Sequence, residues 1–373
     1  MSRSSTVILC CNTAFAIANY RGGVIRELVG RGHRVMVVAP RDHHVDALKA
    51  IGAEFVHWEM SGRSTGPLAQ LAALSRLVRI YRELRADIAF HFTIKSVLYG
   101  AIAGRLTCTP FISVFTGLGY VFTNETLLSV LARWMYRRML PWSKQLWFLN
   151  ADDHQEFVRR RLVNSAVQVD VLPGEGVDLG RFAPAPMPPH QRTSEVVFLM
   201  IARLIKDKGV LELVEAARKV RLRHPDVRVR LLGAVDNGNP TAITQAQLDT
   251  WCAEGVVEYL GVRHDVRRCI AEADAVVLPS YREGIPRALL EAAAMCRPII
   301  ATDVPGCRDV VIDRESGFLC RPRDATDLGR CIDAFLAHTP TERAAMGQRG
   351  RRLIEQRYDE RKVIAKYIDV IEG

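Results

Sequence analysis

Residues 196–213, VVFLMIARLIKDKGVLEL, decide the fold class of this chain. A continuous apolar run, 196–202, leads into a loop with Arg203 and Lys208, and a helical pattern starts at Gly209. A strand that is apolar along its whole length is buried on both faces, as in a parallel sheet. The stretch therefore predicts the strand, loop and helix of a doubly wound α/β domain.

The same alternation of strands and helices extends in both directions from this stretch. It predicts two Rossmann-like domains, 1–180 and 195–355, joined by the proline-rich linker 181–194 and followed by a helix in 356–373 that crosses back to the first domain. Such folds bind ligands outside the carboxyl ends of their strands, here in the cleft between the domains. The predicted strands are 6–11, 34–40, 87–92, 110–115, 145–150, 196–202, 227–233, 256–261, 275–280 and 298–302. The predicted helices are 22–31, 66–85, 95–106, 126–140, 209–223, 243–253, 287–296 and 359–371.

Composition and charge limit the class of protein. The 373 residues are 49% hydrophobic, which suffices for two cores, and no apolar run reaches the ~18–20 residues of a membrane span. The short apolar N-terminal run does not fit a signal peptide, so we expect a cytoplasmic protein. Nine cysteines without Cys-x-x-Cys spacing indicate neither disulfides nor a metal site.

The net charge of +10 calls for an anionic partner, which could be nucleic acid, an anionic membrane surface or a phosphorylated substrate. The basic residues are spread widely instead of forming a stripe, and this argues against nucleic acid. Arg203 and Lys208 suit a diphosphate, because they flank a turn at the start of a helix. The competing explanation is a pair of solvated basic residues.

Two glutamates follow the strand at 275–280. Glu283 stands in a loop before Pro286, which fits the first helical position, and Glu291 lies within an apolar helical run. A buried carboxylate must accept hydrogen bonds, and a pair of ribose hydroxyls would supply them. We expect Glu283 to bind a sugar, helped by the N–H groups of Gly284 and Ile285. The alternative is a structural helix cap and an ion pair between Glu291 and Arg287.

Two other strand ends give weaker signals. Gly22 and Gly23 let the backbone approach a ligand after the first strand, although an ordinary βα turn is an equal alternative. The backbone at Val262 and Arg263 could hydrogen-bond a flat heterocycle.

These residues together resemble a family-four retaining glycosyltransferase of the GT-B fold. The resemblance rests on Glu-x7-Glu in EGIPRALLE, the Arg and Lys of ARLIKDKG, LPGEGVDLGRF (172–182) and the RGG loop. It implies that Arg203 and Lys208 hold the donor diphosphate, with Gly22 and Gly23 nearby. It also implies that Glu283 holds the donor sugar, that Glu291 holds the ribose, and that no metal or cofactor is needed.

Two further segments narrow the resemblance to transferases that extend polyprenyl-diphosphate-linked sugars in O-antigen, capsule and glycan precursors. They are HFTIKSVLYGAIAGRL (91–106) and ISVFTGLGYVFT (112–123). The expected donor is a UDP-linked N-acetylhexosamine or hexose, with a GDP-sugar as the alternative. Many family members carry a histidine at the position of Thr116, so a histidine-centred acceptor site is not predicted. The acceptor-side candidates are Lys95, Thr116, Gly117 and Gly119, with a purely structural Lys95 equally open.

The segment 127–148, LLSVLARWMYRRMLPWSKQLWF, interleaves basic and aromatic residues. A basic, aromatic amphipathic helix suits peripheral attachment to the anionic inner leaflet of the plasma membrane, where a lipid-linked acceptor resides. The alternative is a helix packed on the first sheet with a charged outer face. Two other functions stay open for the chain: a nucleotide-sugar epimerase of the same fold, and a membrane- or nucleic-acid-binding protein without catalysis.

Overall fold

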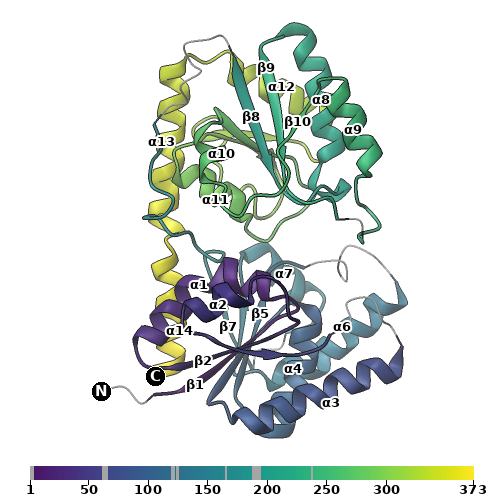
Figure 1. Cartoon of the computed structure of the whole chain (residues 1–373), viewed down its shortest axis with the longest axis vertical. Helices are drawn as coiled ribbons and strands as arrows, with labels where there is room; N and C mark the ends of the chain where they lie inside the picture. Colours follow the sequence, from purple (N-terminus) through teal and green to yellow (C-terminus); the bar gives the residue numbers. More distant parts are fainter. Residues whose placement is uncertain are drawn as a thin grey trace. The chain divides into compact units, whose positions relative to one another are not determined.

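The computed structural model describes residues 4–60, 66–118, 122, 126–163, 166–186, 195–236 and 238–373 (Figure 1). It forms two compact units, the first made of Met1–Glu175 with Glu360–Gly373 and the second of Gly176–Asp359. Each unit is built on one parallel sheet with helices on its faces. The predicted fold class, two Rossmann-like doubly wound domains, is confirmed.

The first unit has a seven-stranded sheet in the order β3-β2-β1-β4-β5-β6-β7. Its central strands are buried along their whole length because helices cover both faces, as the continuous apolar runs predict. The strands are β1 (Thr6–Cys10), β2 (Arg34–Ala39), β3 (Glu54–His57), β4 (Ile88–Phe92), β5 (Phe111–Phe115), β6 (Gln145–Phe148) and β7 (Gln168–Val171). The helices are α1 (Ala14–Gly30), α2 (Val45–Ala50), α3 (Pro67–Leu84), α4 (Ile94–Thr107), α6 (Leu127–Met139), η1 (Leu140–Trp142), α7 (Ala151–Arg159) and α14 (Glu360–Glu372).

Helix α14 brings the end of the chain back into the first unit, beside α1 (Figure 1). Its Tyr367 is buried, with its ring 4.7 Å from the ring of Phe90 and 4.9 Å from that of Trp147. At its end, Glu372 contacts Nε2 of His33 at 3.1 Å. The last helix is therefore part of the core of the first unit.

Helix α1 corrects the prediction of a helix over 22–31. Thr13 is its N-cap and accepts a hydrogen bond from the N–H of Ala16 at 3.1 Å, so the helix begins much earlier. Gly22 and Gly23 therefore lie inside the helix and do not form a loop that could approach a phosphate. A Cβ atom at Gly23 would lie 2.8 Å from Oε2 of Glu360, so this glycine makes room for the start of α14.

The second unit has a six-stranded sheet in the order β10-β9-β8-β11-β12-β13. The part of the predicted linker that the structure describes, 181–186, packs on this unit: Arg351 donates to the carbonyl of Phe182 and Arg297 to that of Pro186. The strands are β8 (Val196–Ile201), β9 (Val227–Leu232), β10 (Glu258–Tyr259), β11 (Ala275–Leu278), β12 (Ile299–Thr302) and β13 (Gly317–Cys320). The helices are η3 (Lys206–Lys208), α8 (Val210–Arg223), α9 (Gln245–Ala253), α10 (Arg267–Ala271), α11 (Arg287–Ala294), α12 (Ala325–Leu336) and α13 (Pro340–Arg357).

Each sheet has one point where the strand order reverses. In the first unit it lies between β1 and β4, and in the second between β8 and β11, which pair directly. Loops that leave the carboxyl ends of two such strands run to opposite faces of the sheet and leave a crevice between them. The two reversal points are therefore where a ligand site is expected in each unit.

Candidate active site

Lys208 and Glu283 meet at the reversal point of the second sheet. Lys208 is the last residue of η3, the short helix that follows β8 in the chain. Glu283 follows the neighbouring strand β11. Gly209 has a φ of +74°, and a Cβ atom there would lie 2.1 Å from the carbonyl oxygen of Pro279. Glycine lets the two loops pack this closely, and the packing brings the Lys208 and Glu283 side chains together.

The Glu283 carboxylate receives two donors on the same oxygen. The Lys208 ammonium forms an ion pair with Oε1, and the Ser280 hydroxyl donates to this oxygen at 2.6 Å. The exposed fraction of the side chain is 21% for Lys208 and 11% for Glu283, and Ser280 is fully buried. Charges this far removed from water are screened less than a surface pair, so they dominate the local electrostatics.

The loop after β11 is held by the last residue of β12 and by residues that follow this strand. The Thr302 hydroxyl donates to the carbonyl oxygen of Ser280. Gly306, with a φ of +80°, lies so close that a Cβ atom would be 1.9 Å from the carbonyl oxygen of Gly284. Cys307 is buried at the same place, and burial raises the pKa of its thiol well above the usual range. The loop is therefore fixed by the neighbouring strand, and the thiol beneath it stays neutral.

Glu291 lies on α11 and accepts a hydrogen bond from Nε of Arg287 at 2.8 Å. Its side chain is only 13% exposed, and burial raises the pKa of the carboxyl despite the opposing charge of Arg287. The ion pair of the alternative hypothesis is thus present, whereas its helix cap is not found in the described chain. Pro286 is the N-cap and not the first helical residue as predicted, and no side chain caps α11 there.

Arg203 follows β8, and the heterocycle candidates follow β10, which is separated from β8 by β9. Nη1 of Arg203 donates to Oδ2 of Asp236 at 3.0 Å, and the side chain is 57% exposed. Within the described part of the chain, Arg203 does not contact Lys208 or Glu283. Val262 and Arg263 follow β10 in an exposed loop, and Ile285, two residues after Glu283, is buried. Of the four predicted side chains, Lys208 and Glu283 therefore contact each other directly, whereas Arg203 and Glu291 have other partners.

The acceptor-side candidates of the first unit lie near the reversal point between β1 and β4. Lys95 stands in the first turn of α4, directly after β4, and burial lowers the pKa of its ammonium group. The N-cap of α4, Thr93, has a φ of +71°, which is unusual for a β-branched residue. Thr116 and Gly117 follow β5 and are half-buried, whereas Gly119 lies outside the described residues.

Two interactions at these strand ends escaped the sequence analysis. Ser280 gave no pattern to follow, because a serine after a strand is common. Arg21 belongs to the RGG segment, in which the two glycines, and not the arginine, gave the predicted phosphate loop. Its guanidinium is buried 3.7 Å from the centre of the Phe92 ring and forms an ion pair with Glu175. The pairing of an unusually buried arginine with a glutamate so distant in the chain leaves no signal at the sequence level.

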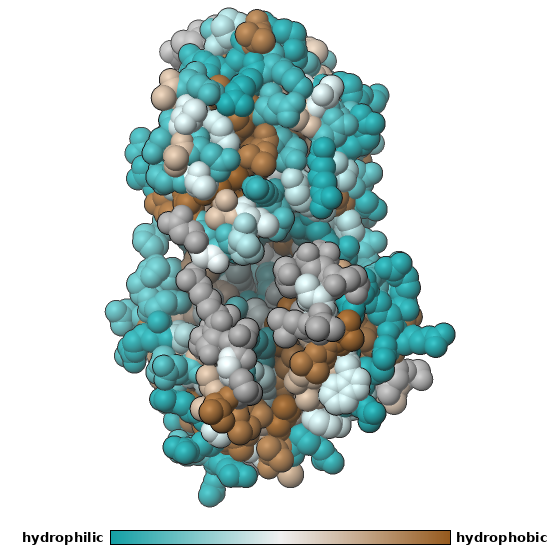
Figure 2. Space-filling model, turned by 90° about the vertical axis from the view of Figure 1, so that its right-hand side faces the viewer, coloured by the Kyte–Doolittle hydropathy of each residue, from teal (hydrophilic) through white to brown (hydrophobic). Residues whose placement is uncertain are grey.

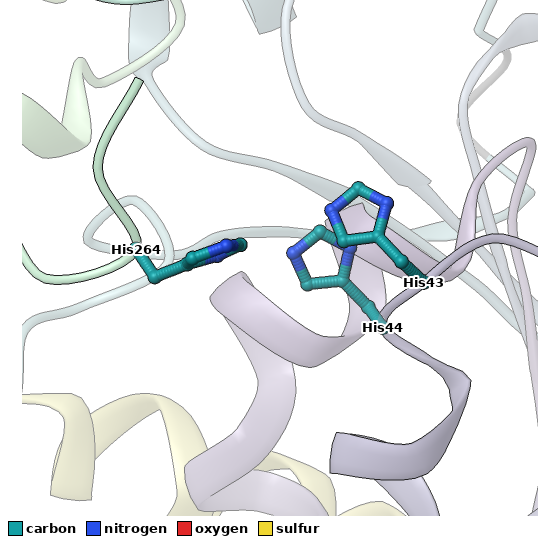
Figure 3. Close-up of side chains that lie close together, drawn as sticks. All are labelled: His43, His44 and His264. Atoms are coloured by element: carbon teal, nitrogen blue, oxygen red, sulfur yellow. The ribbon is translucent and has the colours of Figure 1, made fainter. Parts of the chain in front are cut away.

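Figure 3 labels three histidines. His43 and His44 precede α2 in the first unit, and their ring centres lie 4.0 Å apart. The ring of His44 also packs edge-on against Phe15 at 4.9 Å. His264 belongs to the second unit, where it is exposed ahead of α10. Two of the three histidines thus belong to the first unit and one to the second.

Two family models match the chain, one in each unit. The glycosyl transferase 4-like domain matches residues 16–175, and the model for glycosyl transferases group 1 matches residues 187–353. The first match falls in the unit with the Lys95 region, and the second in the unit with the Lys208–Glu283 pair.

Several proteins of known activity or structure are similar. The N,N'-diacetylbacillosaminyl-diphospho-undecaprenol alpha-1,3-N-acetylgalactosaminyltransferase of Campylobacter jejuni is 27% identical over 316 residues, which cover 81% of each chain. The Escherichia coli UDP-Gal:alpha-D-GlcNAc-diphosphoundecaprenol alpha-1,3-galactosyltransferase is 27% identical over 267 residues, covering 69% of this chain and 68% of the relative. The crystal structure of Anabaena HepE in complex with UDP and glucose has the same fold, with a TM-score of 0.82 at 18% identity, covering 99% of this chain and 100% of that one.

Sequence family, relatives and fold agree on one class of enzyme. The chain belongs to the glycosyltransferases of the GT-B fold, with a glycosyl transferase 4-like first unit and a second unit of the glycosyl transferases group 1 family.

Proposed function

We propose that this glycosyltransferase moves a sugar from a UDP-sugar to a polyprenyl-diphosphate-linked saccharide, with retention at the anomeric carbon. The donor sugar is an N-acetylhexosamine or a hexose. The observation that carries the proposal is the Lys208–Glu283 pair at the reversal point of the second sheet. In this proposal, Lys208 is the cation for the diphosphate and the neighbouring Glu283 is the carboxylate for the sugar.

In the proposed donor site, each group at the carboxyl ends of the strands of the second sheet has a role. Lys208 and Arg203 hold the diphosphate, and Glu283 accepts hydrogen bonds from sugar hydroxyls beside the N–H groups of Gly284 and Ile285. Glu291 accepts hydrogen bonds from the ribose. The backbone at Val262 and Arg263 borders the heterocycle. UDP is favoured over other nucleotides because HepE was crystallised with UDP and the E. coli relative is named for a UDP-linked donor.

The chemistry needs stabilisation of a leaving diphosphate. The acceptor hydroxyl oxygen bonds to the anomeric carbon while the bond from that carbon to the diphosphate oxygen breaks. The electron pair leaves with UDP, whose phosphate takes the hydroxyl proton on the same face of the sugar. A unit charge ~4 Å away contributes about 4 kcal/mol at an effective dielectric near 20. Lys208 and Arg203 can supply this stabilisation, so we propose that transfer needs no metal.

The proposed acceptor site lies in the first unit. The N-terminus of α4 and the Lys95 ammonium offer positive charge to a second diphosphate, the one that links lipid and saccharide. Thr116 and Gly117 lie one strand further along the sheet. The lipid-linked acceptor is supported by the names of the C. jejuni and E. coli relatives, which act on undecaprenyl-diphosphate-linked sugars.

The outer face of α6 supports peripheral attachment to an anionic membrane. Val130, Leu131 and Trp134 are each more than half exposed, and the guanidinium of Arg138 lies 5.7 Å from the centre of a Trp134 ring. Trp142 is 42% exposed just beyond the helix. Figure 2 shows hydrophobic side chains at the surface on the side of this unit that carries α3 and α6. An exposed tryptophan beside arginines suits the headgroup region of a bilayer.

The structure also restricts which residues of this segment can face a membrane. Two aromatic residues of the segment 127–148, Tyr136 and Trp147, are buried in the core. Arg137 donates to the carbonyl oxygens of Arg160 and Arg161 and so caps α7. None of the helices in the described residues is both long enough and apolar enough to cross a bilayer. We therefore propose attachment to the inner face of the plasma membrane through the outer face of α6 alone.

A panel of nucleotides and nucleotide sugars tests the donor. We expect UDP and one or more UDP-sugars to raise the melting temperature, and GDP, ADP and NAD to leave it unchanged. The UDP-sugars that bind are then tested for transfer to undecaprenyl-diphosphate-linked N-acetylhexosamine with chelator present. Stabilisation by GDP-sugars alone would overturn the UDP assignment, and activity lost on chelation would overturn metal independence.

A further inference from the structure

The two oxygens of the Glu283 carboxylate have different surroundings. Both donors, the ammonium of Lys208 and the hydroxyl of Ser280, reach Oε1. In the described residues no hydrogen bond reaches Oε2, and the side chain retains 11% of its exposure. One oxygen is thus used by the protein, and the other is left for a ligand.

We propose that Ser280 is a positioning residue, whose hydroxyl fixes Oε1 of Glu283 and thereby presents Oε2 to a hydroxyl of the donor sugar. This inference rests on the proposed function, in which Glu283 binds the sugar. The hydrogen bond from a hydroxyl to a carboxylate is charge-assisted, and it restricts the rotation of the carboxylate plane.

Lys208 alone cannot fix the orientation of the Glu283 carboxylate. Its ammonium has three donors on a flexible side chain, and a bound diphosphate carries more negative charge than one carboxylate. When the donor binds, the diphosphate competes with Glu283 for Lys208. Ser280 is neutral and fully buried, so no ligand can draw it away. The serine hydroxyl is the contact that keeps the carboxylate in place in both states of the site.

The position of Ser280 is itself set by the sheet. It follows β11 closely, and its carbonyl oxygen accepts a hydrogen bond from the hydroxyl of Thr302, the last residue of β12. Both residues are buried. A hydroxyl anchored to two adjacent strands moves less than one on a loop, and this precision is what a sugar-binding carboxylate needs.

The test compares Ser280→Ala with Ser280→Cys, which keeps a weak donor of similar size. Ser316→Ala serves as the matched control, because Ser316 is a buried serine of the same unit whose hydroxyl, among the described residues, bonds only to the backbone of Ile312. Calorimetry measures the affinities for UDP and for UDP-N-acetylglucosamine, UDP-N-acetylgalactosamine and UDP-galactose. Transfer assays with the donor that binds best give kcat and KM.

We expect Ser280→Ala to leave the affinity for UDP unchanged and to lower kcat/KM by about 10- to 100-fold, mostly through kcat. Ser280→Cys should recover part of this loss, and Ser316→Ala should show none. Equal kcat for wild type and Ser280→Ala overturns the positioning role while the proposed function stands. A parallel loss of UDP affinity means that Ser280 only supports the fold, and it also overturns the role. A wild type that binds UDP but no UDP-sugar overturns the sugar role of Glu283, and the inference falls with it.

Discussion

Lys208 and Glu283 form an ion pair across the reversal point of the second sheet, although 75 positions separate them in the chain. In the proposed donor site, the diphosphate of the donor competes with Glu283 for the Lys208 ammonium. We therefore expect loss of Lys208 and loss of Glu283 to change the affinity for UDP in opposite directions.

Glu283→Gln should lower the transfer rate at least about 100-fold and raise the affinity for free UDP several-fold. The amide removes the negative charge that holds Lys208 and repels the diphosphate. Lys208→Ala should weaken UDP binding by about tenfold or more. Isothermal titration of both variants with UDP checks the pair, and a change of UDP affinity in the same direction for both contradicts the assignment.

Gly306→Ala should unfold the donor site. The added Cβ would meet the carbonyl oxygen of Gly284 at 1.9 Å, and the φ of +80° disfavours any side chain. We expect a loss of about 2–4 kcal/mol in the free energy of unfolding together with loss of transfer. Gly255→Ala is the control: Gly255 has a φ of +65°, but the nearest atom to its Cβ is a side-chain nitrogen of Arg221 at 3.6 Å.

Chemical denaturation of Gly306→Ala and Gly255→Ala separates the cost of backbone strain at a positive φ from the cost of the steric clash with Gly284. Gly255→Ala should cost only about 1 kcal/mol, the price of the left-handed conformation. If Gly306→Ala costs no more than Gly255→Ala, the loop after β12 does not hold the loop of Glu283.

Gly22→Ala tests the correction of the first helix. Gly22 lies inside α1, and the nearest atom to an added Cβ is 3.5 Å away, so alanine should stabilise the protein by about 0.5–1 kcal/mol. Gly23→Ala should gain less, because the Glu360 carboxylate must turn away from the new methyl group. Neither variant should change the affinity for UDP. A large loss of UDP binding would instead restore the phosphate-loop interpretation of the RGG segment.

The strands and the fold class could be predicted because apolar runs of buried parallel strands are local in sequence. The start of α1 could not be predicted, because a Gly-Gly pair usually indicates a turn. Here Gly23 instead leaves room for the Glu360 side chain of another helix, which the local sequence does not show. The edge strands β3 and β7 were also missed, since each is four residues long and carries polar side chains. The local sequence pattern therefore predicts the central strands of each sheet. It does not predict features that depend on packing between segments distant in the chain.

The candidate site shows the same limit. Glu283 and Lys208 were identified by type and by their place at strand ends, and the structure pairs them. The same local reasoning could not tell that Arg203 contacts Asp236, or that Ser280 donates to Glu283. The i, i+4 pair of Arg287 and Glu291 was foreseeable, since helical spacing alone brings such residues together.

The affinity for a UDP-sugar should fall in acid through Glu291. Burial raises the pKa of this carboxyl above its usual 4.5, and only the ionised form can accept two hydrogen bonds from ribose hydroxyls. As the pH falls from neutrality, protonation therefore begins at a higher pH than for an exposed glutamate. Titrations should use a UDP-sugar and not UDP, whose terminal phosphate itself titrates near pH 6.

Glu291→Gln provides the comparison for this pH dependence. It should bind the UDP-sugar more weakly than wild type at pH 7.5, and its affinity should change little between pH 7.5 and pH 5. A wild-type affinity that stays constant over the same range, or a variant that shows the wild-type slope, removes Glu291 from the ribose site.

Membrane attachment should depend on the outer face of α6. The double variant Leu131→Ser and Trp134→Ser removes two half-exposed apolar side chains, and we expect its partition coefficient on vesicles with anionic phospholipid to fall about tenfold or more. Leu222→Ser is the matched control, because Leu222 is 87% exposed on α8 in the other unit. Arg137 is left intact, since its contacts with the end of α7 make its loss a change in the fold.

Sedimentation with vesicles at two salt concentrations separates the apolar contribution to binding from the charge contribution. The double variant should keep the salt dependence that Arg138 and other basic residues confer, because screening acts on charges and leaves apolar insertion almost unchanged. Equal partitioning of wild type and double variant would mean that Leu131 and Trp134 do not insert into the bilayer, and it would overturn the apolar contribution of the outer face of α6.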